Sequence, residues 1–337
     1  MIFNYLEYCV CPNCRVDLIK TENGVRCIQC LREYPIEDGI LLLLPEYKGE
    51  TQIRYQRNYE VIAKDYIDLN RFKSNNDAHK YQRLLRFIGR KHKGKKILDI
   101  GSGQAFLLEE LDADFKVAFD ISLTRLKTSK QSDKIIRIQG DAELLPFKPK
   151  FFDLIIISDI LEHLLHTDEL INVLRLICSK DTRIFVHVPW EEDISSYLDK
   201  DYPYEFAHLR SFNAFNYNKL WLGFKIVRYE YTTPNLWRMP LIFRLDGYIP
   251  LPIYNTLVWC YFHIPGLQEK DYQQRDKWFY QLPRNEWWLL RLFKPMFRTF
   301  EMRFREDTPI PLDSNIICNI KRKWRNISIF AKRRSFT

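Results

Sequence analysis

The chain has 337 residues, of which 46% are hydrophobic and 28% charged, and its formal net charge is +9. This length is enough to bury a full hydrophobic core, and eight cysteines are too few for a fold held together by disulfides. The amino terminus has neither the basic segment nor the long apolar run of a secretory signal peptide. We therefore expect a cytoplasmic protein without a transmembrane helix.

Two Cys-x-x-C pairs lie close together near the amino terminus. The first pair is Cys11 and Cys14, the second is Cys27 and Cys30, and the segment between them contains an Asn-Gly hairpin signal. A hairpin that brings two such pairs together offers zinc four thiolates in a tetrahedron, with no position left open for catalysis. We predict a structural Zn²⁺ held by these four cysteines, with Cys9 as a spare. The alternative is reduced cysteines that pack as small apolar residues.

The residues after the second cysteine pair read as a turn followed by an apolar strand, "LREYPIEDGILLLLPE" at 31–46. Together with the cysteine pairs, residues 9–46 resemble a small zinc-ribbon family whose members often precede, or bind, methyltransferase domains. The resemblance implies an amino-terminal zinc-ribbon domain over 1–48. A domain of this size buries too little surface to fold alone, so the metal would contribute much of its folding free energy.

From residue 95 onward, apolar strands alternate with helical runs, which is typical of a doubly wound α/β sheet. The first strand ends in a turn that contains Asp99, Gly101 and Gly103, and such a turn brings backbone N–H groups close to a ligand. The second strand ends in Asp120, an acid placed to accept hydrogen bonds from ribose hydroxyls. The glycine turn alone would also suit a dinucleotide. The expected strands lie within 97–100, 115–122, 134–147, 151–164, 183–189 and 223–231.

Taken in order, these features are similar to class I S-adenosylmethionine-dependent methyltransferases of the type-11-like group, over about residues 55–231. The resemblance implies a mostly parallel, seven-stranded Rossmann-like sheet, S-adenosyl-L-methionine as the cofactor, and an amphipathic helix at 58–69 that closes over it. Ala105 stands where this family usually has a further glycine. The implied cofactor-binding residues are Asp99, Gly101, Ser102 and Gly103 around the methionine part, Asp120 and Ile121 at the ribose, Asp141 and Ala142 at the adenine, and Ser158 at the end of the fourth strand.

The candidate catalytic residues follow the fourth and fifth strands. Asp159, Glu162 and His163 are spaced so that a helix starting there would present all three on one face, at the mouth of the site. His208 is expected to approach the same mouth. The Asp-x-x-Glu-His order resembles the metal sites of ubiquinone-pathway O-methyltransferases and small-RNA 2′-O-methyltransferases, which have Glu at the first position. Acid/base catalysis and binding of a divalent cation both stay open for these side chains, as does a structural role.

The last third of the chain is less regular. The sixth expected strand ends near Tyr231, and the next strand-like run, "SNIICNIKRK" at 314–323, is expected to close the sheet. The methyltransferase domain would then comprise 51–231 and 314–323. The residues between them, 232–313, are rich in aromatic residues and proline, and we expect a substrate or lid subdomain there. An ordinary hydrophobic subdomain is the alternative, and a basic tail follows at 324–337.

Basic residues are concentrated in two segments. Residues 79–96 contain eight basic residues and no acid, and residues 320–334 carry seven positive charges. Both segments predict contact with an anionic partner, either a membrane surface at which the protein is peripheral or RNA, and solvated surface is the alternative.

The predicted reaction is methyl transfer to an oxygen or nitrogen of a small, or lipid- or saccharide-linked, acceptor. Two other functions stay open. The chain would methylate rRNA or tRNA in the first, and in the second it would bind the cofactor as a partner protein without turnover.

Overall fold

The structure, a computed structural model of the 337-residue chain, describes residues 4–65, 81, 84–129, 132, 134–221, 223–232 and 297–304. Spatially the chain divides into one compact unit of Met1–Glu230 with Arg298–Thr337 and a second unit of Tyr231–Phe297. The described residues lie almost entirely in the first unit, which carries the sheet and the candidate site.

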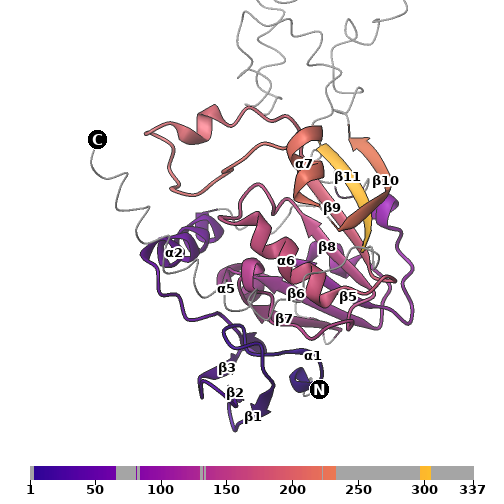
Figure 1. Ribbon diagram of the computed structural model, residues 1–337. Helices are drawn as coiled ribbons and strands as arrows, with labels where there is room; N and C mark the ends of the chain where they lie inside the picture. The colour runs from indigo at the N-terminus through magenta and orange to yellow at the C-terminus, as the bar shows by residue number, and fades with distance from the viewer. Residues whose placement is uncertain are drawn as a thin grey trace, which may run out of the picture. The chain divides into compact units, whose positions relative to one another are not determined.

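The core of the first unit is a twisted sheet whose central strands run parallel (Figure 1). The pairs β5–β6, β6–β7, β5–β8 and β8–β9 are all parallel. Strand order reverses between β5 and β8, and open α/β sheets bind ligands at such a point, outside the carboxyl ends of the strands. The order β7-β6-β5-β8-β9-β11-β10 is formed by β5 (Lys96–Ile100), β6 (Phe115–Asp120), β7 (Ile135–Gln139), β8 (Leu154–Ser158), β9 (Arg183–Pro189), β10 (Phe224–Thr232) and β11 (Phe297–Phe304).

The central strands are buried on both faces, which explains their continuous apolar sequences. In β8, for example, Ile155, Ile156 and Ile157 are all fully buried. Helix α6 (Thr167–Ile177) packs its apolar face on this core. Ser122 caps the start of α5 (Leu123–Thr128), where its hydroxyl accepts a hydrogen bond from the Arg125 N–H. The other helices are α1 (Tyr5–Tyr8), α2 (Glu50–Asp65), α4 (Phe106–Glu109) and α7 (Ala214–Leu220), with 3₁₀ turns η1 (Ala142–Leu144) and η2 (Ser195–Leu198).

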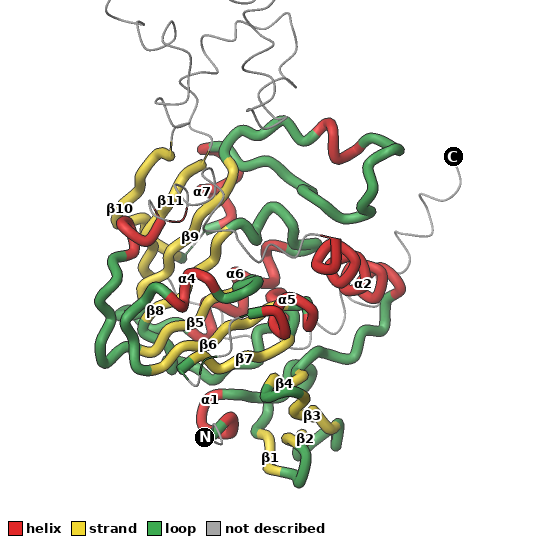
Figure 2. The backbone as a smooth tube through the Cα atoms, turned by 180° about the vertical axis from the view of Figure 1, so that it is seen from behind, coloured by secondary structure: helices red, strands yellow, loops and turns green. Residues whose placement is uncertain are grey.

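Residues 4–47, here called the cysteine module, extend this sheet at one edge. β1 (Leu18–Lys20), β2 (Gly24–Cys27), β3 (Glu33–Glu37) and β4 (Ile40–Leu42) form an antiparallel meander. β4 then pairs in parallel with β7, and the result is an eleven-stranded mixed sheet (Figures 1 and 2). The predicted α/β Rossmann-like sheet is therefore confirmed, but the sheet is larger than the seven strands expected. The domain limits at 1–48 stay a prediction.

β11 lies between β9 and β10 in the sheet, and its residues fall within the range 232–313 that the sequence analysis assigns to an insertion. Phe300 and Met302 of β11 are buried, and they alternate with Glu301, which is also buried. Arg183 Nε donates to Glu301 Oε1 at 2.8 Å, so the acid is paired inside the sheet. Arg298, Glu301 and Arg303 interrupt the apolar residues of this strand, so its sequence is a weaker strand signal than that of 314–323. That segment and nearly all of the expected insertion lie outside the described residues, as does the basic segment 320–334.

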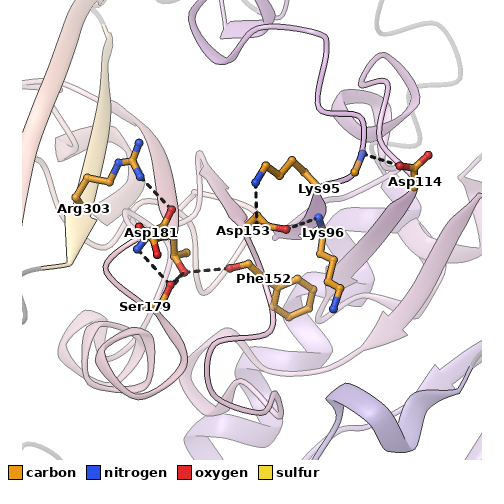
Figure 3. Close-up of polar contacts among 10 residues, drawn as sticks. Lys95, Lys96, Asp114, Phe152, Asp153, Ser179, Asp181 and Arg303 are labelled. Carbon is orange, nitrogen blue, oxygen red and sulfur yellow. Dashed lines mark hydrogen bonds and ion pairs between the residues drawn. The ribbon is translucent and has the colours of Figure 1, made fainter.

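Polar contacts tie the amino ends of several strands together (Figure 3). Asp153, just before β8, accepts hydrogen bonds from the Lys96 N–H at 2.9 Å and the Lys95 ammonium at 3.4 Å. Arg303 of β11 donates to the carbonyl oxygen of Asp181, which precedes β9, at 3.0 Å. These contacts hold the end of the sheet opposite to the carboxyl ends. Within the described part of the chain, no helix combines the length and the apolar character needed to cross a lipid bilayer.

Candidate functional site

A cavity of about 240 Å³ lies at the carboxyl ends of the central strands. Gly101 follows β5, Asp120 ends β6, Asp141 follows β7 and Asp159 follows β8, and all four line the cavity. Other lining residues come from α2 and from the loop at 190–213 between β9 and α7. The cavity therefore occupies the place where a doubly wound sheet binds its ligand.

The turn after β5 requires glycine at its first position. Gly101 has φ +69° and Gly103 φ +55°, in the left-handed region that side chains rarely adopt. A Cβ added to Gly101 would also come within 2.0 Å of Ile160 Cγ1, so the turn has no space for a side chain there. Ala105 has φ +62° as well, which explains why the resemblance leads one to expect glycine at that position. The backbone of this turn borders the cavity at Gly101.

Asp120 is buried at the end of β6 and is held by the turns around it. Its Oδ2 accepts a hydrogen bond from the Gly103 N–H and its Oδ1 one from the Ser122 N–H, both at 2.8 Å. Burial raises the pKa of Asp120, and the Arg125 guanidinium and these two N–H groups offset part of that rise. A carboxylate fixed at the wall of the cavity suits a ligand with hydroxyl groups. The arrangement fits the predicted ribose position.

Helix α2 forms hydrogen bonds to the residues that follow Asp120. The carboxylate of Glu60 accepts hydrogen bonds from the N–H of Leu123 at 2.6 Å and from the Ser122 hydroxyl at 3.2 Å, at the start of α5. The predicted amphipathic helix at 58–69 is thus the second half of a longer helix, Glu50–Asp65, and residues 66–69 lie outside the described residues.

Asp141 lies in the turn after β7 and is also buried. It caps η1 by accepting a hydrogen bond from the Glu143 N–H at 2.9 Å, and its second oxygen accepts one from the Tyr47 hydroxyl at 3.0 Å. Burial and the neighbouring carboxylate of Glu143 raise the pKa of Asp141. Ala142 lines the cavity beside Asp141. No sequence pattern indicated that Tyr47 would contact Asp141.

The nine predicted cofactor-binding residues divide into two groups. The cavity is lined by Gly101, Asp120, Ile121, Asp141 and Ala142. The other four belong to the same strand ends and turn but are not among the lining residues: Asp99, Ser102, Gly103 and Ser158. Burial, followed by repulsion from Asp120, raises the pKa of Asp99, which favours its protonated form.

The structure corrects one expectation about the candidate catalytic residues. Asp159, Glu162 and His163 do not lie on a helix, because Asp159 has φ +52° and the chain forms a turn before α6 begins at Thr167. The turn still brings a side-chain atom of Glu162, of His163 and of His208 within 4.8 Å of one another. Asp159 instead accepts a hydrogen bond from the Ser158 hydroxyl at 3.1 Å.

The two candidate histidines have defined ring orientations. His163 Nδ1 donates to the carbonyl oxygen of Ala207 at 3.0 Å, and the acceptor allows only the tautomer with the proton on Nδ1. Burial, followed by His208, lowers the pKa of His163 to about 3, so its ring is neutral at neutral pH. His208 Nδ1 lies 2.5 Å from Glu192 Oε2, which holds the His208 ring as in a His–carboxylate dyad. Glu192 was missed by sequence analysis because it shares no motif with His208.

A continuous row of aromatic rings, here called the aromatic wall, lines the part of the cavity formed by α2, His163 and the 190–213 loop. Neighbouring rings have centroids 4.6 to 5.9 Å apart. The loop between β9 and α7 is tied to α2 by Asn58 Nδ2, which donates to Phe206 O at 2.7 Å. Sequence analysis missed the tyrosines of this loop, since only the fold shows that they meet α2. The wall consists of Tyr55, Tyr59, His163, His208, Tyr197, Tyr202 and Tyr204.

The four predicted zinc ligands also come together. Cys11, Cys14, Cys27 and Cys30 present sulfur atoms that all lie within 4.8 Å of one another, and the Cys11 and Cys30 sulfurs are 3.8 Å apart. Four sulfurs about 2.3 Å from one zinc would be about 3.8 Å apart in a tetrahedron, so the spacing fits a structural zinc. The N–H groups of Gln29 and Cys30 point at Cys27 Sγ, at 3.3 and 3.4 Å.

Comparison with known proteins agrees with this geometry. Residues 72–228 match a family model described as a methyltransferase domain, and this range includes the glycine turn, all four strand ends and both candidate histidines. The match supports a methyltransferase. No curated protein matches the sequence.

Solved structures to which the chain is similar include phosphoethanolamine N-methyltransferase 2 of Haemonchus contortus in complex with S-adenosyl-L-methionine (14% identity, TM-score 0.46). That similarity covers 74% of this chain and 57% of the Haemonchus chain, so this chain spans little more than half of it. Another is a SAM-dependent methyltransferase from Archaeoglobus fulgidus, with 19% identity, a TM-score of 0.43 and coverage of 73% of this chain and 99% of that chain.

Proposed function

We propose that the chain is an S-adenosylmethionine-dependent methyltransferase that acts on an oxygen or nitrogen of a small, or lipid- or saccharide-linked, acceptor. The observation that carries the proposal is one cavity with two unlike walls. One wall has the glycine turn, Asp120 and Asp141, and the other has aromatic rings and the histidine pair. A methyl donor and an acceptor would meet between them.

The residues of the first wall fit the cofactor. The Gly101 turn, which has no room for a Cβ, would hold the methionine part, Asp120 and Ile121 the ribose, and Asp141 and Ala142 the adenine. When bound, the cofactor supplies a methyl group on a positively charged sulfur. The remaining work of such an in-line displacement is to hold the acceptor in position and to accept its proton.

The second wall supplies groups for both tasks. Glu192 holds His208 so that the other ring nitrogen of His208 is the one able to take a proton from the acceptor. His163 is neutral and packs against His208, with ring centroids 4.6 Å apart. A divalent cation bound by Glu162, His163 and His208 is the competing role for the same cluster, because its ligand atoms are close enough to share one ion.

The aromatic wall supports an acceptor with a flat or apolar face. Tyrosine rings pack against the C–H face of a sugar or against an isoprenoid chain, and their hydroxyls keep a polar edge. The structure of the basic segment 79–96 supports an RNA acceptor less than its composition does, because some of its positive charge is paired with acids of the same chain. Arg90 pairs with Glu110 and Lys95 with Asp153, whereas Arg86, Lys91 and Lys93 are exposed among the described residues of this segment. Lys80 and Arg83 lie outside the described residues.

Calorimetric titration with S-adenosylhomocysteine, the demethylated cofactor, tests the proposal. Asp120→Ala removes a carboxylate that would accept charge-assisted hydrogen bonds worth about 1.5–3 kcal/mol, so binding should weaken about ten- to a hundredfold. Asp114→Ala is the matched control, because Asp114 is an exposed acid that accepts a hydrogen bond from the Gly94 N–H at the far end of the sheet. Equal affinity of Asp120→Ala and the parent, or a preference for a nicotinamide dinucleotide, would contradict the assignment.

A further inference from the structure

The cysteine module packs directly on the segment that carries Asp141. The Leu43 N–H donates to Gln139 O at 2.8 Å, just beyond the last β4–β7 pair. On the other side of the same segment, the Val10 N–H donates to Pro146 O at 2.9 Å. The chain from 139 to 146, which includes the adenine side of the cavity, is therefore bordered by the cysteine module at both ends.

One side chain of the module reaches a predicted site residue. Tyr47 is its last residue, and its hydroxyl donates to Asp141 Oδ2 at 3.0 Å. The other oxygen, Asp141 Oδ1, is taken by the Glu143 N–H. Burial, followed by the charge of Asp141, raises the pKa of Tyr47, so the hydroxyl keeps the proton that it donates. The orientation of the Asp141 carboxylate depends on η1 on one side and on the module on the other.

Residues of the first Cys-x-x-C pair connect the sulfur cluster to this contact. Asn13 lies between Cys11 and Cys14, and its Oδ1 accepts a hydrogen bond from the N–H of Glu46, the neighbour of Tyr47, at 3.1 Å. Arg15, directly after Cys14, has φ +63° and donates to the carbonyl oxygens of Leu145 and Phe147. A metal that fixes the sulfurs on both sides of Asn13 also fixes the backbone from which Asn13 and Arg15 project.

We propose that the cysteine module is part of the cofactor site, in which a metal held by the four cysteines orients Asp141 through Asn13 and Tyr47. The inference rests on the proposed function for the identity of the cofactor. Tyr47 is a positioning residue, since it acts through Asp141. Metal and cofactor then bind cooperatively, and the coupling is reciprocal: whatever factor the metal adds to cofactor affinity, the cofactor adds to metal affinity.

The first test measures S-adenosylhomocysteine affinity by calorimetry on the full-length, zinc-loaded chain. Tyr47→Phe removes one hydrogen bond to a buried carboxylate and should weaken binding about three- to tenfold. Asn13→Ala keeps all four thiols and should retain one zinc per chain by elemental analysis, yet weaken binding about two- to fivefold. Tyr8→Phe is the matched control. Tyr8 belongs to the same module, and its ring packs on Phe115 and Phe151 outside it, so loss of the Tyr8 hydroxyl should leave the affinity unchanged.

The second test uses reciprocity and does not depend on turnover. Zinc affinity is measured by competition with a chelator, with and without saturating S-adenosylhomocysteine. The ligand should tighten zinc binding in the parent by about three- to tenfold and by clearly less in Tyr47→Phe. Unchanged cofactor affinity in both variants, or zinc affinity that ignores the ligand in the parent, would overturn the inference. A parent that binds zinc but no S-adenosylhomocysteine would instead overturn the proposed function.

Discussion

Ala105 is the position at which this chain departs from the glycine turn of the family that it resembles, and its backbone is left-handed. An L-residue in this conformation costs about 1–2 kcal/mol, and the glycine that would relieve it costs about 0.5–1 kcal/mol in unfolded-chain entropy. The two effects nearly balance, with the backbone strain slightly larger. Ala105 therefore keeps the turn at a small loss of stability.

Ala105→Gly should accordingly raise the free energy of unfolding by up to about 1 kcal/mol, as measured by urea unfolding. Ala118→Gly in β6 is the control, because Ala118 is a fully buried strand residue outside the left-handed region and glycine there should destabilise by about 0.5–1 kcal/mol. Equal destabilisation by both substitutions would mean that the turn at 105 is not strained.

At the scale of elements, η1 and α6 are joined by one buried acid. Glu143 of η1 accepts hydrogen bonds from the His166 N–H at 2.8 Å and from His166 Nδ1 at 2.9 Å, directly before α6. The hydrogen bond to Glu143 raises the pKa of His166, and burial opposes part of that rise. The pair thus ties the turn that carries Asp141 to α6, which packs on the core of the sheet.

The sign of the pH dependence follows from this raised pKa. The stabilisation by protonated His166 is fully present below the unfolded pKa of about 6.5, and it is lost as pH rises through the higher folded pKa. Urea unfolding at pH 6, 7, 8 and 9 should show a fall in parent stability that His166→Gln lacks. Parallel pH profiles for parent and variant, separated only by a constant offset from lost packing, would contradict the ion pair.

An element can be predicted from the sequence when the interactions that form it depend mainly on its own residues. Strands such as β8 are predictable because burial on both faces demands an unbroken apolar run. The helix expected at Asp159 was wrong, since the periodic pattern of 159–164 cannot show the positive φ that places these residues in a turn. β11 was missed because Glu301 is compensated by Arg183, which is distant in sequence.

The candidate site shows the same limit. Gly101 and Asp120 follow strands at recognisable spacings, so their place at the strand ends was predictable. Tyr197 and Glu192 were not, because they reach His208 only through the path of a loop. Tyr47 reaches Asp141 only because β4 joins the edge of the sheet at β7, and strand patterns do not specify that partner.

At the scale of the whole molecule, the first unit brings three distant stretches to one cavity. The cysteine module borders the cavity at Asp141 through Tyr47, α2 and the 190–213 loop supply most of the aromatic wall, and the strand ends carry the acids. The proposed function assigns the acids at the strand ends to the methyl donor and the aromatic wall to the acceptor. Methyl transfer should therefore depend on His208, whereas cofactor binding should not.

Transfer of a labelled methyl group from S-adenosylmethionine to fractionated cell extract tests this account most directly. The parent chain should label a component of the lipid or saccharide fraction. His208→Ala should bind S-adenosylhomocysteine as the parent does but label that component about a hundred- to ten-thousandfold more slowly. Label found in RNA would favour the alternative acceptor. A parent that binds the cofactor and labels no fraction would contradict the account and make the chain a cofactor-binding partner protein.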